Sequence, residues 1–280
     1  MTLYFSRLTL RRDPSTQALS ALIDPRRRAL AMDAHHRLLW SAFSDGADRT
    51  RDFLWRAEAR GRFYTLSARP PKNHDHSLFK PPEVKEFAPA LRPGDRLAFQ
   101  LRANAVTQRP KDPNDRSAPS KTHPKGRVRS RKVDVAMDVL NPLPGRSAST
   151  APGSGNEPSE RQRQRYGLAR QAAYDWLSRQ GDAHGFKTDP LPGPDDDRDR
   201  QAGFVLEHYG TVALPSHRGK RKGEPRFGVF DMRGVLTVTD PDAFLDKLAR
   251  KLDAPPEDSQ RSGFGRAKSF GCGLMLIRRI

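Results

Sequence analysis

Two neighbouring histidines are the residues in this chain whose chemistry best suits acid–base catalysis. His35 and His36 border the apolar stripe of a predicted helix over residues 26–43. An unperturbed imidazole titrates close to neutral pH, so it can take a proton from a phosphodiester substrate or return one to it. Packing or surface exposure is the commoner explanation of a helical histidine, and both interpretations stay open at this point.

A basic, glycine-rich segment near the C-terminal end is the second candidate site. It has the sequence GFGRAKSFGCG and precedes a predicted strand. It is not a P-loop, because five residues rather than four separate Gly265 from Gly271. Bare main-chain N–H groups beside cationic side chains can hold a phosphate, whereas glycines that only satisfy turn geometry are the alternative. The candidate contacts are Gly263, Gly265, Arg266, Lys268, Ser269 and Gly271.

A second basic segment, LPSHRGKRKGEPRF at residues 214–227, joins two predicted strands. Its alternative interpretation is a solvated hairpin tip. So many cations repel one another without a partner, and a basic β-ribbon fits a nucleic-acid groove, so we favour nucleic-acid binding here. The candidate contacts are Arg218, Lys220, Arg221, Lys222 and Arg226.

The composition of the whole chain points to the same class of partner. The 280 residues include 51 Lys and Arg against 33 Asp and Glu, a formal net charge of +18. Such a surplus indicates nucleic acid, an acidic protein or an anionic membrane. The membrane is the least favoured, because the chain has no long apolar run and no signal-peptide pattern, and a cytoplasmic location is expected.

Metal and cofactor chemistry receive little support from the sequence. Cys272 is the only cysteine, which excludes disulfide frameworks and cysteine-rich zinc sites. The sequence His-Asp-His at residues 74–76 has no third ligand nearby. We therefore expect neither a metal site nor a cofactor.

The elements that must position these residues repeat one order twice. In the first half we predict β-α-β-β-α-β, and the second half shows the same order, which is typical of a ferredoxin-like fold. The predicted elements of the first half are strand 3–10, helix 26–43, strands 52–59 and 62–68, helix 81–91 and a strand within 92–108. Those of the second half are strand 127–140, helix 159–180, strands 203–215 and 226–239, helix 240–252 and strand 273–280.

The sequence therefore predicts an α+β protein of two tandem ferredoxin-like (RRM-like) domains. We expect an N-terminal domain at 1–107, which carries the histidines, and a basic linker at 108–126. A C-terminal domain at 127–280 is expected to carry the basic hairpin and the glycine-rich segment. A Pro-, Gly- and Ser-rich stretch at 142–158 is expected to be a flexible insertion.

Four stretches, taken together, resemble one protein family. In chain order they are HRLLWSAF from residue 36, DFLWRAE from residue 52, FQLRANAVT from residue 99 and GRAKSFGCGLMLI from residue 265. They are similar to the CasE (Cse3) family, the CRISPR repeat-processing endoribonucleases of the type I-E Cascade complex. The resemblance extends from Leu3 to Ile277, apart from the insertion.

The resemblance implies an activity and partners. The expected substrate is the stem-loop of CRISPR repeat RNA, cleaved at the 3′ base of the stem without a metal. The 2′-hydroxyl attacks the adjacent phosphate and leaves a 2′,3′-cyclic phosphate and a 5′-hydroxyl, so only RNA can react. The enzyme is expected to stay bound to its product as a Cascade subunit. A non-catalytic RNA-binding subunit and a purely structural ribonucleoprotein component are the alternatives.

The resemblance also implies roles for individual residues. In the family, the catalytic histidine lies four residues before an aromatic or polar helix position and seven before an apolar one. Here Trp40 and Phe43 occupy these two positions, so the resemblance selects His36 rather than His35. Members of the family often carry a tyrosine at the position of Asp33. The Asp33 carboxylate can orient His36 or raise its pKa, but an ionised carboxylate cannot donate a hydrogen bond as a phenol does. Lys268 or Arg266 is expected to balance the charge of the transition state.

Overall fold

The computed structural model describes residues 2–19, 28–44, 51–72, 77–110, 130–140, 160–191, 203–213, 226–250, 252 and 262–280. Several predicted features lie outside these ranges. They are His74 and His76, the greater part of the linker 108–126, the whole insertion 142–158 and the side chains of Arg218, Lys220, Arg221 and Lys222. None of the helices in the described part of the chain is long and apolar enough to cross a membrane.

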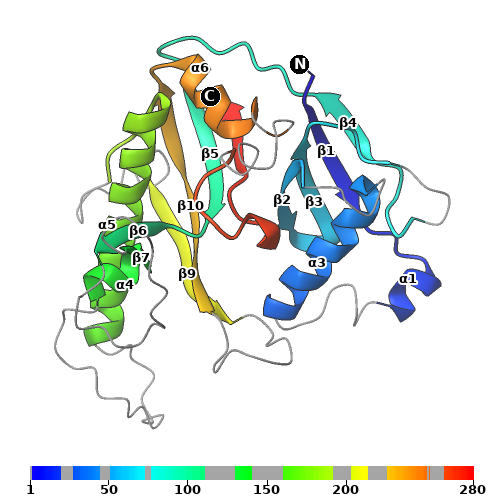
Figure 1. The fold of residues 1–280 in the computed structure, drawn as a ribbon, viewed down its shortest axis with the longest axis horizontal. Coiled ribbons are helices and arrows are strands. Elements are labelled where there is room, and N and C mark those ends of the chain that lie inside the picture. Colours follow the sequence, from blue (N-terminus) through cyan, green and yellow to red (C-terminus); the bar gives the residue numbers. More distant parts are fainter. Residues whose placement is uncertain are drawn as a thin grey trace, which may run out of the picture.

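The first sheet has four antiparallel strands in the order β2-β3-β1-β4. They are β1 (Tyr4–Thr9), β2 (Phe53–Glu58), β3 (Arg62–Ser67) and β4 (Glu83–Glu86). Helix α3 (Arg28–Phe43) packs against this sheet through Leu39, Ala42 and Phe43, which join a core that includes Phe53 and Trp55 (Figure 1). The short helix α1 (Pro14–Ala18) follows β1 and is capped by Asp13, whose carboxylate accepts a hydrogen bond from the Thr16 N–H at 2.8 Å.

The predicted helix at 81–91 is wrong. Residues Glu83–Glu86 form the edge strand β4, which pairs with β1, and all four side chains are exposed. Prolines at 81, 82 and 89 leave too few residues for a helix that could bury an apolar stripe. Pairing with β1 satisfies the backbone of so short a segment instead.

The second sheet has the order β11-β5-β10-β8, and β9 pairs with another part of β10. Its strands are β5 (Arg96–Ala103), β8 (Phe186–Thr188), β9 (Val205–Ala213), β10 (Arg226–Val238) and β11 (Met275–Arg279). Helix α5 (Glu160–His184) and helix α6 (Pro241–Leu245), which continues into a π-turn (Asp246–Arg250), supply part of its core. As predicted, Asp240 caps α6 by accepting the Ala243 N–H at 3.0 Å.

Both sheets have the strand order of the ferredoxin-like fold, as predicted, but β5 belongs to the second sheet rather than the first. It pairs with β10 and β11, and thereby serves as the first strand of the second unit. Its alternating burial fits either sheet, so the sequence pattern could not choose between them. The proposed boundary at residue 107 stays a prediction.

The predicted strand at 127–140 is correct only in part. Residues Ser130–Asp134 form β7, which pairs with β6 (Val106–Pro110) in a separate two-stranded sheet. The chain then turns into helix α4 (Val135–Leu140), and the Asp134 carboxylate accepts the N–H groups of Ala136 and Met137 at 3.0 and 3.1 Å. The capping hydrogen bonds of Asp134 start a helix at this point. The apolar pattern alone predicts that the strand continues to residue 140.

The C-terminal segment from Ser262 to Met275 connects the two sheets. Phe264, Leu274 and Met275 are buried in one continuous core with Leu54 and Leu66 of the first sheet. Figure 1 shows this segment running between the sheets, with a 3₁₀ turn, η3 (Lys268–Phe270), directed toward α3. The glycine-rich segment and the histidine-bearing helix, far apart in sequence, are thus in contact.

Candidate active site

Helix α3 places its two histidines in different surroundings. The His35 side chain is buried, and its ring lies edge-on to Phe63 and Trp55 with centroids 4.9 and 6.4 Å apart. The His36 ring is half-buried and lies 6.5 Å, centroid to centroid, from Phe270 of η3. Successive helical residues point about 100° apart, so only one of two neighbours can join the core below the helix. His35 packs in the core, and His36 faces the glycine-rich segment.

The surroundings of His36 favour its neutral form. Burial lowers the pKa of His36, the charge of Arg51 lowers it further, Asp33 raises it and Arg37 lowers it. The indole N–H of Trp40 also donates to Nε2 at 2.9 Å, a bond that only the neutral ring accepts. At neutral pH the imidazole is therefore uncharged. Its acceptor nitrogen, Nε2, holds the indole N–H, so it can take a proton from a substrate only when that hydrogen bond is released.

Replacing Trp40 with Phe is expected to raise the pKa of His36. The indole hydrogen bond stabilises only the neutral ring, so its removal makes protonation more favourable. Any activity that needs the neutral imidazole should then fall at mildly acidic pH while staying unchanged at higher pH. An NMR titration of the imidazole signals measures the shift directly. An unchanged His36 pKa in Trp40→Phe would show that burial and charge alone set it.

Asp33 is held beside the histidine by its own helix. Its carboxylate pairs with Arg37 at 2.8 Å, one helical turn further on. Its charge raises the pKa of His36, the direction expected from the sequence, but burial and Arg51 outweigh it. Asp33 therefore contributes charge to the site, and nothing in its geometry substitutes for a phenolic donor.

The turn η3 brings a cation and a hydroxyl to the same place. The ammonium group of Lys268 donates to the Ser262 carbonyl, and Ser269 Oγ accepts a hydrogen bond from Arg51 Nη1 at 3.0 Å. Burial lowers the pKa of Lys268 to about 7, with further lowering by the charges of Lys247 and Arg51. Lys268 thus changes its charge in the physiological pH range.

The glycines of this segment are explained by protein contacts. A Cβ on Gly265 would lie 2.6 Å from the Asn104 carbonyl oxygen, and one on Gly271 would lie 2.9 Å from the Trp55 ring. Both residues also have positive φ angles, of 74° and 73°. The N–H groups of Gly263 and Gly271 bond to the Lys247 and Lys268 carbonyls. Turn geometry and close packing are therefore sufficient reasons for glycine at positions 265 and 271, and contact of this segment with RNA stays a prediction.

Replacing Gly265 with Ala is expected to destabilise the fold by about 2–4 kcal/mol, from backbone strain and from the clash with Asn104. Gly94→Ala is the matched control, because Gly94 has a φ of 90° but a Cβ placed there would meet no described atom within 4 Å. Thermal or urea unfolding of both variants separates the two costs. Equal losses would mean that the loop moves away from Asn104 freely.

The base of the basic hairpin also reaches α3. Met32 of α3, Val212 of β9, Val229 of β10 and Cys272 form a small buried cluster, with Phe227 and Phe270 packed against it. Arg226, at the start of β10, is exposed beside this cluster. Arg266 is exposed as well, on the glycine-rich segment. The described part of the predicted basic surface thus borders the histidine and η3.

Arg51 is a component of the site that the sequence did not reveal. It stands two residues before β2, and its charge acts on both His36 and Lys268. One arginine among 51 basic residues carries no pattern that distinguishes it. Only the packing of β2 against η3 identifies it.

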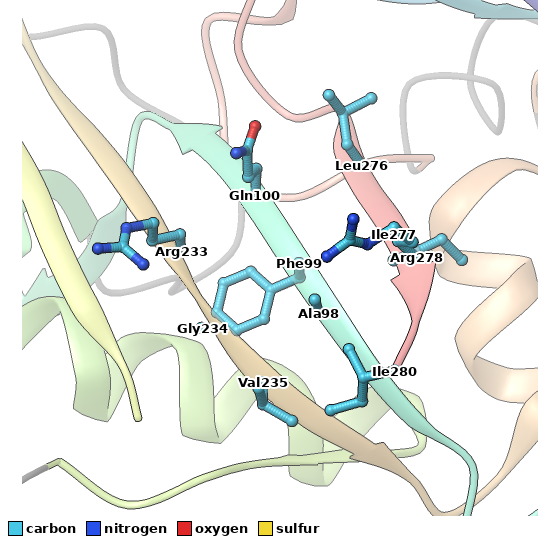
Figure 2. Close-up of a pocket in the computed structure, with 10 residues that line it drawn as sticks. All are labelled: Ala98, Phe99, Gln100, Arg233, Gly234, Val235, Leu276, Ile277, Arg278 and Ile280. Atoms are coloured by element: carbon cyan, nitrogen blue, oxygen red, sulfur yellow. The ribbon is translucent and has the colours of Figure 1, made fainter. Parts of the chain in front are cut away.

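A hollow of about 650 Å³ lies elsewhere, over strands β5, β10 and β11 (Figure 2). The charged side chains that line it are Arg233 and Arg278. The other side chains that line it are apolar or, at Gln100, an amide, so no histidine, lysine or acidic side chain lines this hollow. The candidate catalytic residues predicted from the sequence, His36 and Lys268, lie on α3 and η3 instead.

Comparisons with known proteins agree with this architecture. The chain is similar to CRISPR endoribonuclease Cse3 bound to a 19-nucleotide RNA, with 20% identity, a TM-score of 0.55 and 99% of each chain covered. Thermus thermophilus Cse3 bound to an RNA representing a pre-cleavage complex gives 20% identity and a TM-score of 0.53, over 99% of this chain and 100% of that one. A CRISPR-associated protein from Thermus thermophilus gives 18% identity and a TM-score of 0.50, over 98% and 99%.

Sequence comparison identifies the family. No curated protein matches the chain significantly. A family model described as CRISPR associated protein, however, matches residues 3–279, nearly the whole length. The family resemblance noted in the sequence is thereby confirmed. The chain belongs to the CRISPR-associated protein family, and it has the fold of the Cse3 (CasE) proteins.

Proposed function

We propose that this protein is a metal-independent endoribonuclease that binds the stem-loop of CRISPR repeat RNA, cleaves at the 3′ base of the stem and then stays bound as a Cascade subunit. One observation carries the proposal. A neutral, half-buried imidazole on α3 faces a turn that supplies Lys268, and Arg51 acts on both. A base beside cations is the arrangement that transesterification of a phosphodiester requires.

In the proposed reaction the 2′-hydroxyl gives its proton to the neutral His36 as its oxygen bonds to phosphorus. The P–O5′ bond breaks, the 5′-oxygen takes up a proton from solvent water, and a 2′,3′-cyclic phosphate and a 5′-hydroxyl result. The lowered pKa of His36 favours the general-base role, because the free base predominates at neutral pH. A protonated Lys268 stabilises the charge on the phosphorus oxygens.

The second candidate, an RNA-binding subunit without activity, is favoured by the presence of Asp33 in an ion pair with Arg37, where family members often carry a tyrosine. Incubation with a repeat stem-loop in EDTA separates the two candidates. The enzyme cuts the RNA once per molecule and leaves a cyclic phosphate. An RNA with a 2′-deoxy sugar at the cut site should bind and survive. Stoichiometric binding without cleavage of the all-ribose RNA would establish the second candidate.

The basic hairpin is proposed to follow the RNA stem through phosphate contacts. Changing Lys220, Arg221 and Lys222 together to Ala is expected to weaken RNA binding. The slope of log affinity against log salt concentration should become shallower by about 2–3, because binding releases about one counterion fewer for each phosphate contact that is lost. Filter binding over a salt series measures this slope. An unchanged slope would remove the hairpin from the interface.

A further inference from the structure

The charge of Arg51 is partly buried, and its hydrogen-bond partner is a neutral hydroxyl. The side chain is half-buried just before β2 of the first sheet, and this burial lowers its pKa. Its Nη1 donates to Ser269 Oγ at 3.0 Å. Within the described part of the chain, no carboxylate bonds the guanidinium. A desolvated charge in this state is costly unless an anion joins it.

The described carboxylate that follows Arg51 in the sequence and the one that precedes His36 on α3 pair with other arginines. Asp52, the next residue, pairs with Arg69 at 2.7 Å, and Asp33 pairs with Arg37 at 2.8 Å. A guanidinium has five N–H donors in a planar fork, and the bond to Ser269 uses one of them. The remaining donors suit the two non-bridging oxygens of a phosphate.

The position of Arg51 specifies which phosphate this is. Its charge acts both on the imidazole of His36 and on the ammonium of Lys268. Among the described residues, the other charges that act on these two groups are those of Asp33 and Arg37 on α3, which act on His36, and that of Lys247 in the π-turn, which acts on Lys268. An anion held by Arg51 would therefore lie beside the proposed base.

We infer that Arg51, oriented by Ser269, binds the non-bridging oxygens of the scissile phosphodiester of the RNA. This inference rests on the proposed function and adds a phosphate-binding residue to it. The phosphate supplies a negative charge that the described residues do not bring to this guanidinium. Until RNA binds, the same guanidinium disfavours protonation of His36, which keeps the base ready.

The test combines a protein change with a change to a single phosphate. Wild type and Arg51→Gln are each titrated with a stem-loop that carries a 2′-deoxy sugar at the cut site, with either a normal or an uncharged methylphosphonate linkage there. Each change alone should weaken binding about tenfold. The two changes together should weaken binding little more than either one alone, because both remove the same contact. Additive losses would overturn the inference.

Two controls make the outcome specific. A methylphosphonate placed two linkages away should combine additively with Arg51→Gln. Arg37→Gln, which alters an arginine that already has a carboxylate partner, should combine additively with the methylphosphonate at the cut site. Arg51→Lys, which keeps the charge, should restore part of the binding, and thermal unfolding checks that each variant is folded.

The pH dependence of cleavage of the all-ribose stem-loop gives a second readout. The acid limb of this profile should move upward in Arg51→Gln, because His36 loses a neighbouring positive charge, and Arg51→Lys should reverse the shift. An unmoved limb together with additive binding losses would assign Arg51 a structural role. If wild type does not cut the all-ribose stem-loop at all, the proposed function fails instead, whatever the binding cycle shows.

Discussion

Replacing His36 with Ala is expected to lower the single-turnover rate of stem-loop cleavage by about 10³-fold, within the range that a positioned acid–base group contributes. The imidazole faces η3 from a helix whose packing depends on other residues, so the fold should persist. Affinity for a 2′-deoxy stem-loop should change by less than about threefold, because the loss concerns the transition state.

His35→Ala is the matched control, one residue away on the same helix. Its ring packs against Phe63 and Trp55, so its removal should reduce the free energy of unfolding by about 1–3 kcal/mol. Cleavage per folded molecule should remain near the wild-type rate. If His35→Ala abolished cleavage while His36→Ala did not, the assignment of the base would be wrong.

Replacing Lys268 with Met is expected to lower the second-order rate of cleavage by about 10²-fold, the scale expected for one group that stabilises a developing oxyanion. The effect should depend on pH. The proposed reaction needs neutral His36, whose pKa lies below its ordinary value, and protonated Lys268, whose pKa is about 7. Activity of the wild type should therefore rise with pH through the first pKa and fall through the second.

The shape of this profile separates Lys268 from a merely structural residue. Lys268→Met should lose the alkaline limb and keep the acid limb. Lys268→Arg, which stays protonated, should also lose the alkaline limb while retaining more activity. Saturating RNA should shift the wild-type alkaline limb upward, because a phosphate favours the charged ammonium. An alkaline limb that persists in Lys268→Met would belong to another group.

Much of the secondary structure followed from local pattern. The period of the apolar residues predicted α3 and α5, and the Asp-Pro pair predicted the start of α6. Partial alternation predicted β1, and short segments on either side of a turn predicted β3 and β10. The resemblance of short motifs predicted the family and the fold. The sequence also identified His36, Lys268 and Arg266 as candidate site residues, because their side-chain chemistry and the motifs that contain them can be recognised without a structure.

Where each strand pairs was decided by the tertiary structure. The segment at 96–103 alternates equally well for either sheet, and only its partners β10 and β11 place it in the second. The segment at 83–86 became a strand because an edge of the first sheet was open beside it. The partner that stabilises each of these strands is distant in sequence, so a short stretch of residues does not indicate which sheet the strand joins.

What the sequence by itself determined was most of the local elements, the strongly basic character and the family. What only the tertiary structure decided was which of two adjacent histidines is buried, why the glycines are required, and that Arg51 joins the site. The physical reason is the same in each case. Burial, close contact and the pairing of charges are properties of neighbours in space, and these neighbours lie up to 218 residues apart along the chain.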